Sequence, residues 1–516
     1  MTRTIWFWTG LSSGLLLLFF GLKVLRFNAL YYTYNDMYIF LQSACSWIDG
    51  RPLLYENIWG YSGRIHNNYI LLLIGPLLYV GGAYGAFAVQ VGLLLVSYGW
   101  LIRYVSKRAA GWVTGLLAGA LLLGPVSFWF NEHPNIGWHP ELSYWPLTLL
   151  FALALLSGRR GSLALTAVGI VLVKEDGALL AGVVHLGYLS LAYLRANPAR
   201  SIWGVLATAR FWRVLIGWAL AFGAGMAFLA YKNHSAEPEP RLQQALSVVQ
   251  NGLHQAAFIR VHGRLLLDTL LLLLPTTGLL AYGLYRNGWR QAGSVWLVYG
   301  TALAVLTVSN GVQGATYYGT NPLFELVSLT WPPRFVLVWA FSVSYVLFYW
   351  LGFRPDARPV RAGQPALLGA LLFAVQVPAV EHARPDASFG PLFRNLVAYP
   401  YDPQKLPLLP AADVAVVREV ARTIPPRSSV YVFDYLIPLF HRHYNIWPTD
   451  KHWARADVAV IPNHDFQHLG ERLPRVMNGP YRAYRLGTYT LYATPGAEPA
   501  VRAAIGRFEP GALKRT

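Results

Sequence analysis

The sequence predicts an all-α polytopic membrane bundle of about eleven helices followed by a small α/β domain. Three observations predict this fold class. The 516 residues are 55% hydrophobic and 13% charged, with a mean hydropathy of +0.37, whereas a soluble chain of this length needs far more charged surface. The apolar residues occur in blocks of about 20, enough for a helix to cross a bilayer core of roughly 30 Å. After residue 380 the Leu-rich blocks end, and proline and charged residues become frequent.

The first apolar block runs from Ile5 to about Val24. It is too long for the core of a signal peptide and has no clear small-residue cleavage site, so we expect an uncleaved first span. Ten further spans are expected at approximately 84–105, 111–128, 142–157, 161–173, 177–194, 212–231, 265–284, 293–309, 334–352 and 365–380.

Basic residues predict the orientation of these spans. If the N-terminus is cytoplasmic, the cytoplasmic connections hold many basic residues, among them Lys107, Arg160 and Arg213, and a single acid, Asp356. This distribution obeys the positive-inside rule, and eleven spans then place the C-terminus outside the cytoplasm. The net charge of +18 is dispersed between apolar blocks and forms no basic face, so nucleic acid is not an expected partner. We therefore expect a multi-pass protein of the cytoplasmic (inner) membrane, surrounded by membrane lipids.

The chain divides into two predicted domains. Residues 1–380 form the transmembrane domain, and its long first outer loop, 28–83, contains two short apolar segments that we expect to lie as helices along the outer interface. Residues 381–516 form a periplasmic or otherwise extracytoplasmic α/β domain. Apolar residues at helical spacing predict a helix over 411–424. Strand-like runs are expected at 429–433, 456–461, 481–485 and 488–493, the last two as a hairpin.

Polar residues at the outer ends of the spans are the candidates for chemistry. Asp36 begins the first loop helix, where an Asp serves equally well as a helix N-cap or as a general base at the membrane surface. His66 precedes the second apolar segment, and a polar hinge is the structural alternative there. His139 and Glu141 flank Pro140 at the start of a span, where Pro suits the first helical turn and Glu the positive end of the helix dipole. Their side chains also suggest a divalent cation, although their spacing matches no established metal motif.

Lys174, Glu175 and Asp176 form the most informative cluster. About 13 helical residues, roughly 20 Å, separate them from Arg160, which is less than the thickness of the bilayer core. The three charges are therefore expected at or below the outer membrane boundary, where ionisable residues are costly and line a cavity or pair with one another. A structural Lys–Glu pair is the simpler alternative. Arg334 begins a later span at the same level and is expected to join the same cavity.

These motifs, in this order, resemble a widespread family of polytopic bacterial and archaeal membrane proteins, catalogued as a domain of unknown function. The likeness covers most of the chain. One departure is Gly137-Trp138, where the family usually has Asp-Phe, and it argues against a need for an acid two residues before His139. The matching residues are Asp36, Gly50-Arg51-Pro52, His66 before Tyr69-Ile70-Leu71, His139-Pro140-Glu141, Leu172-Val173-Lys174-Glu175-Asp176, Ile424-Pro425-Pro426, Ser429-Val430, Asn445-Ile446 and Ala456-Asp457-Val458.

That family is similar to the GT-C glycosyltransferases, which have many spans, a carboxylate in the first outer loop, interfacial helices and often a C-terminal outer domain. The resemblance implies that a sugar passes from a polyprenyl-phosphate donor to an envelope acceptor on the outer face of the membrane. Cations at headgroup depth would hold the lipid phosphate, and a carboxylate would take the proton of the acceptor. A transporter or lipid flippase is an alternative, because charged residues within the membrane also mark substrate paths. A non-catalytic envelope protein is a third.

The resemblance also implies a role for each candidate residue. Lys174 and Arg334 would bind the phosphate of the donor. Asp36 is the expected catalytic base, and Glu141 is the second choice. The residues expected to shape the site or to hold a cation are His66, His139, Glu175 and Asp176.

Overall fold

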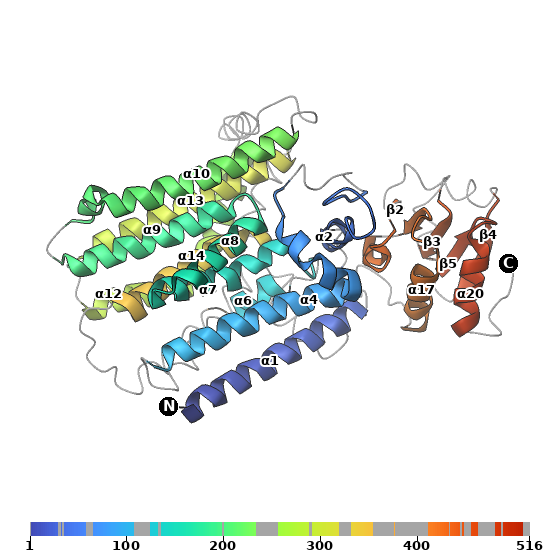
Figure 1. Cartoon of the computed structure of the whole chain (residues 1–516), viewed down its shortest axis with the longest axis horizontal. Helices are drawn as coiled ribbons and strands as arrows, with labels where there is room; N and C mark the ends of the chain where they lie inside the picture. The colour runs from blue at the N-terminus through green and yellow to red at the C-terminus, as the bar shows by residue number, and fades with distance from the viewer. Residues whose placement is uncertain are drawn as a thin grey trace.

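The helical bundle and the C-terminal α/β region are both present in the computed structural model (Figure 1). Eight of the described helices are long and apolar enough to cross a membrane, and α8 (Arg160–Val173) is a shorter apolar helix. The predicted fold class of a polytopic helical bundle with a small C-terminal α/β domain is confirmed. The structure describes residues 2–28, 32, 36–57, 66–107, 124–132, 136–198, 201–233, 256–287, 291–318, 332–353, 376, 411–432, 434–443, 446–447, 456–462, 480–486 and 489–508.

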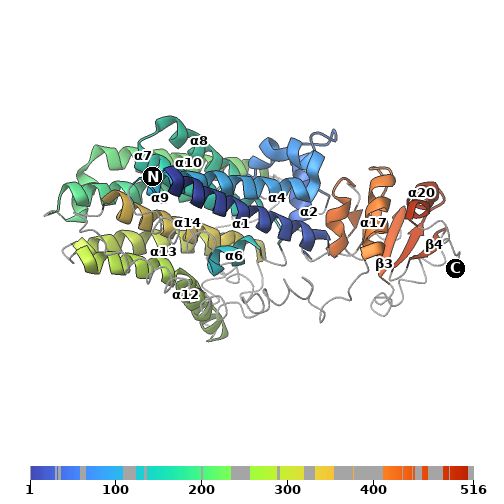
Figure 2. The same ribbon diagram turned by 90° about the horizontal axis from the view of Figure 1, so that it is seen from below.

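The long helices lie side by side along the long axis of the bundle (Figures 1 and 2). Every predicted span that falls on described residues coincides with a helix. Two predicted spans, 111–128 and 365–380, lie largely outside the described residues. The membrane-domain helices are α1 (Thr2–Asn28), α4 (Ile70–Val105), α6 (Pro125–Asn131), α7 (Tyr144–Ser157), α8, α9 (Gly177–Ala196), α10 (Ala209–Asn233), α12 (Ala256–Asn287), α13 (Ala292–Tyr318) and α14 (Pro332–Leu347), with the short turns η1 (Pro140–Ser143), η2 (Ile202–Ala207) and η5 (Phe348–Phe353).

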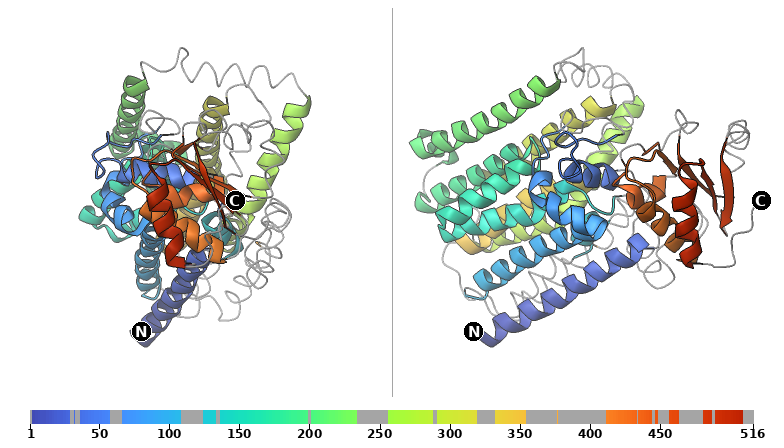
Figure 3. Two further views of the ribbon diagram at one scale, coloured as in Figure 1. Left: turned by 90° about the vertical axis from the view of Figure 1, so that its right-hand side faces the viewer. Right: turned by 45° about the vertical axis from the view of Figure 1, so that its right-hand side comes forward.

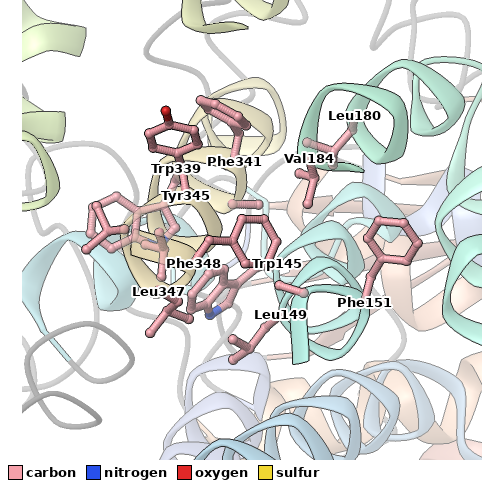
Figure 4. Packing of buried hydrophobic residues seen from close by; sticks show 14 of the residues in the cluster. Trp145, Leu149, Phe151, Leu180, Val184, Trp339, Phe341, Tyr345, Leu347 and Phe348 are labelled. Carbon is pink, nitrogen blue, oxygen red and sulfur yellow. The ribbon is translucent and has the colours of Figure 1, made fainter. Parts of the chain in front are cut away.

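Helices α7 and α14 form the centre of the bundle. The span that contains α7 is 89% buried and the span that contains α14 is 83% buried, whereas the spans of α1 and α10 are only 6% buried. A helix that is apolar on all sides suits a central position. Trp145 of α7 packs against Trp339 of α14, with ring centroids 6.3 Å apart (Figure 4). The exposed apolar residues of α1 and α10 form a surface suited to lipid.

Helix α4 joins two elements that the sequence separates. The apolar segment over 69–80 is helical, as expected, but it continues directly into the span over 84–105 instead of lying apart from it. The two parts meet at Gly82, whose φ of 53° and ψ of −133° are not helical. Glycine adopts this positive-φ conformation at little cost, and it therefore permits a kink here without an intervening loop.

The first loop helix, α2 (Asp36–Cys45), differs from the expectation of an interfacial helix. Its residues from Met37 to Cys45 are all buried. One side packs on α4, and Tyr38 and Ile39 on the other side belong to the hydrophobic core of the C-terminal domain. Gln42 donates a hydrogen bond to the backbone carbonyl of His443 at 3.0 Å. Protein, and not lipid, therefore covers this helix.

The C-terminal domain is a five-stranded mixed sheet in the order β2-β1-β3-β5-β4, with helices packed on it (Figure 1). The parallel strands are β1 (Val430–Val432), β2 (Ile446–Trp447) and β3 (Val458–Pro462); β4 (Arg482–Leu486) and β5 (Tyr489–Ala493) form the predicted antiparallel hairpin. Helix α17 (Ala411–Thr423) was predicted. Strand β2 and helix α20 (Glu498–Phe508) were not, and η7 (Asp434–Phe440) completes the described elements.

The two ends of the described chain lie at opposite ends of the molecule. The N-terminus marks one end of the bundle, and the C-terminal domain lies beyond the other, next to α2 (Figures 1 and 3). The basic residues Arg103, Arg159 and Arg195 lie at turns away from the C-terminal domain, at the end of α4, before α8 and at the end of α9.

Candidate functional site

The turn between α8 and α9 holds the predicted Lys174-Glu175-Asp176 cluster. Lys174 has an extended backbone that ends α8, and α9 begins three residues later at Gly177. A Cβ atom at position 177 would lie only 2.1 Å from the carbonyl oxygen of Ile170. Only glycine fits this close approach, so the turn is tight and directs the three charged side chains into the protein, where all three are buried.

Lys174 and Glu141 form a buried ion pair. Lys174 Nζ lies 2.6 Å from Glu141 Oε1, and their side chains are 0% and 2% exposed. Glu141 reaches this position from η1, which precedes α7. His139 is the N-cap of that turn, because its Nδ1 accepts a hydrogen bond from the backbone N–H of Glu141 at 3.3 Å. The sequence placed Lys174 and Glu141 in one site, and the structure brings them into contact.

Asp176 connects this pair to Arg334. Its Oδ1 accepts a hydrogen bond from the Tyr144 hydroxyl. Its Oδ2 lies 3.9 Å from both Lys174 Nζ and Arg334 Nη1, and accepts no hydrogen bond from the described residues. Burial and the neighbouring carboxylates Glu141 and Glu175 raise the pKa of Asp176, against the influence of Lys174. Asp176 is thus a buried carboxylate that faces two cations.

Glu175 points to the other side, toward the segment before α4. Its Oε1 lies 2.7 Å from His66 Nδ1, and its Oε2 accepts the backbone N–H of Asn67 at 3.0 Å. Burial alone would raise the pKa of Glu175, but contacts with His66, Lys174 and the Asn67 N–H lower it. Burial lowers the pKa of His66 to about 4, so His66 is neutral at pH 7 and its Nδ1–H donates a hydrogen bond to the carboxylate. Asn68 fixes the same segment by donating to the carbonyl of Val173 at 2.8 Å.

Lys232 is a cation of this site that was not predicted from the sequence. It lies in the last turn of α10, and its Nζ donates to Asn67 Oδ1 at 2.6 Å and to the Tyr69 hydroxyl at 3.2 Å. Its ammonium also lies over the rings of Tyr69 and Phe228. The signal in the sequence was a lysine at the end of a span that the positive-inside rule expects to be poor in basic residues.

A second buried charge cluster surrounds Glu132. Its carboxylate contacts Lys23 Nζ at 2.9 Å and Arg26 Nη1 at 2.7 Å, and it accepts a hydrogen bond from the Tyr32 hydroxyl at 2.6 Å. Burial alone would raise the pKa of Glu132, but Lys23 and Arg26 lower it. Lys23 also donates to the carbonyl of Gly137 at 2.6 Å. This cluster anchors α1 to the segment before η1, and its basic residues, Lys23 and Arg26, were not predicted from the sequence.

Asp36 and His139 complete the expected set. Asp36 is the first residue of α2, but its side chain lies outside the described part of the structure. One helical turn further on, the Phe40 ring packs edge-on against His139, with centroids 4.4 Å apart. Burial lowers the pKa of His139 to about 3, which keeps this imidazole neutral. Within the described residues, no three His, Cys, Asp or Glu side chains converge to hold a metal ion.

Among the described residues around Lys174, the number of basic side chains equals the number of acidic side chains. Lys174, Arg334 and Lys232 are the cations, and Glu141, Glu175 and Asp176 are the anions. The exposure of these groups differs: Lys174 is enclosed, whereas 10% of the Arg334 side chain and 14% of the His66 side chain are exposed. An approaching anion therefore reaches Arg334 before Lys174.

Comparisons with known proteins leave the family open. No family model matches the chain, and no curated protein matches it. Among solved structures, the chain is similar to the crystal structure of ArnT from Cupriavidus metallidurans bound to undecaprenyl phosphate. The identity is 12%, the match covers 93% of this chain and 97% of that chain, and the TM-score is 0.42. A likeness of this extent assigns no activity to this chain.

Proposed function

We propose that the chain is a membrane glycosyltransferase that moves a sugar from a polyprenyl-phosphate donor to an envelope acceptor outside the cytoplasm. The observation that carries this proposal is the buried cluster of Lys174, Glu141, Asp176 and Arg334 at the end of an apolar bundle next to the C-terminal domain. Cations at that position provide a site for a lipid phosphate, since phosphate binds strongly to ammonium and guanidinium groups in a water-poor environment.

The residues take the following proposed roles. Arg334, which is partly exposed, meets the donor phosphate first, and Lys174 lies behind it in contact with Glu141. The acceptor hydroxyl attacks the anomeric carbon of the sugar while the bond between that carbon and the phosphate oxygen breaks. Polyprenyl phosphate leaves with the bonding electrons, and the two cations stabilise its charge.

The proton of the acceptor needs a carboxylate base. We assign this role to Asp36, because α2 begins at this residue, one turn before the Phe40 ring that contacts His139. Glu141 is the less suitable base, since its contact with Lys174 favours the charged carboxylate and weakens its pull on a proton. His66, His139 and Glu175 position the loop segments that surround the site.

Asp36→Asn tests the proposed chemistry. The full-length chain is placed in proteoliposomes with radiolabelled polyprenyl-phosphate sugars and an envelope fraction as the source of acceptor, and released polyprenyl phosphate is measured. We expect the turnover of Asp36→Asn to fall by about two to four orders of magnitude, because general base catalysis contributes that much. The control, Asp413→Asn in the first turn of α17, should keep full turnover.

A second variant separates donor binding from chemistry. Arg334→Gln should raise the donor concentration needed for half-maximal turnover more than it lowers the maximal rate. Full turnover of Asp36→Asn would show that a carboxylate other than Asp36 acts as the base. Movement of the labelled lipid between leaflets without release of polyprenyl phosphate would identify a flippase and refute the proposal.

A further inference from the structure

A second candidate binding site lies between the first outer loop and the C-terminal domain. A pocket of about 500 Å³ is lined by Asp49, Gly50 and Arg51, from the turn after α2, and by Pro426 and Arg427, from the turn between α17 and β1. None of these residues belongs to the Lys174 cluster. The motif Gly50-Arg51-Pro52 is thus placed at a junction between two parts of the chain that are far apart in sequence.

The charges around the pocket favour an anion. Asp49, the acid in its wall, already contacts Arg442 at 2.8 Å. Arg442 is held there by the Tyr79 hydroxyl at 2.6 Å and by the Tyr79 ring, 4.2 Å from its guanidinium carbon. Among its described lining residues, the pocket thus has two guanidinium groups, those of Arg51 and Arg427, and one carboxylate, that of Asp49.

The shape of the pocket also suits a ligand from the aqueous side. Arg51 and Arg427 are exposed, and the space above Gly50 is open, with no atom within 4 Å of where a Cβ would stand. Gly50 has a φ of 72°, a conformation that side chains other than glycine rarely adopt. The volume falls within the range of roughly 300–1,000 Å³ that holds small molecules.

We propose that this pocket binds a ligand that carries a phosphate or carboxylate group and is about the size of a sugar phosphate. Guanidinium groups recognise both anions with paired, parallel hydrogen bonds. Because one arginine comes from the loop and the other from the C-terminal domain, such a ligand bridges the two. This site stands independently of the proposed glycosyl transfer, since its ligand needs neither Asp36 nor Lys174.

Calorimetric titration of the purified full-length chain tests the site. The probes are glucose 1-phosphate, glucuronate and uncharged glucose. We expect the two anions to bind and glucose not to bind. Arg51→Gln and Arg427→Gln should each weaken anion binding by about 10-fold or more, the usual size of a lost charge-assisted contact. The matched control, Arg485→Gln on the exposed side of β4, should bind like the natural chain.

Two lipid compositions identify the source of the anion. The chain is titrated with glucose 1-phosphate in nanodiscs of phosphatidylcholine and of phosphatidylglycerol. Equal binding in both supports a soluble ligand, and binding that phosphatidylglycerol suppresses supports a lipid headgroup at the same arginines. Equal binding of glucose and glucose 1-phosphate, or unchanged binding in both arginine variants, would overturn the proposal. Thermal unfolding of each variant verifies that it is folded.

Discussion

The Lys174–Glu141 pair makes a strong test of the geometry of the site. Lys174→Met removes the ammonium group but keeps an unbranched side chain of similar length. The change leaves the Glu141 carboxylate, only 2% exposed, without the cation that lies 2.6 Å away. Arg334 is a nearby cation that remains in this variant, with its guanidinium 3.9 Å from Asp176 Oδ2.

The size of the effect follows from the distance. Two unit charges 2.6 Å apart attract by about 6 kcal/mol at an effective dielectric constant of about 20. Solvation of the separated groups and relaxation of the protein reduce this value, and removal of one partner of a buried pair typically costs about 3–5 kcal/mol. We therefore expect Lys174→Met to lower the free energy of unfolding by about 3–5 kcal/mol.

A double-mutant cycle measures this coupling. The natural chain, Lys174→Met, Glu141→Gln and the double variant are unfolded by SDS titration in mixed micelles, with tryptophan fluorescence as the signal. The double variant should recover most of the loss, because no unpaired buried charge remains from this pair. Lys107→Met, at an exposed lysine, serves as the control and should change little. Additive effects of the two single variants would show that the pair does not exist in the folded protein.

Three further predictions concern pH, packing and topology. Burial lowers the pKa of His66 from 6.5 to about 4. Between these two pH values, the His66 side chain therefore binds a proton in the unfolded chain but not in the folded chain. The free energy of unfolding should fall by about 3 kcal/mol as the pH falls from 6.5 to 4. His66→Asn should flatten this part of an unfolding-versus-pH profile, and an unchanged slope would contradict the burial of His66. Gly177→Ala should abolish folded expression, as judged by size-exclusion chromatography, because its Cβ would meet the Ile170 carbonyl at 2.1 Å; Gly161→Ala, with no atom within 4 Å, should express normally. A reporter that is active only outside the cytoplasm, fused after Thr516, should be active, whereas activity of a cytoplasm-only reporter there would reverse the predicted orientation.

The sequence predicted the spans and the C-terminal hairpin because apolar length and alternation are local properties. Some residues that the sequence assigned to one site are in contact in the structure, such as Lys174 and Glu141, since both lie at the same end of neighbouring spans. Which of these charged residues form pairs depends on side-chain packing, and the spacing of apolar residues along the chain carries no information about that packing. Glu175 pairs with His66 and Lys174 with Glu141, an assignment that only the fold provides.

The three basic residues that were not predicted as part of a site have one sequence feature in common. Lys23, Arg26 and Lys232 lie in or directly after predicted spans, at the ends that the positive-inside rule expects to be free of basic residues. Each contacts buried polar groups: Lys23 and Arg26 contact Glu132, and Lys232 contacts Asn67. A basic residue at such a span end therefore indicates a buried partner.

The position of α2 between the bundle and the C-terminal domain affects biosynthesis. Tyr38 and Ile39 emerge early from the ribosome, but the C-terminal core that they join begins about 370 residues later, at α17. At roughly 5–20 residues per second, the apolar face of α2 stays uncovered for about 20–75 s during synthesis. Exposed apolar surface promotes aggregation, so truncation of the C-terminal domain, which leaves this face uncovered, is expected to give a membrane protein prone to aggregation.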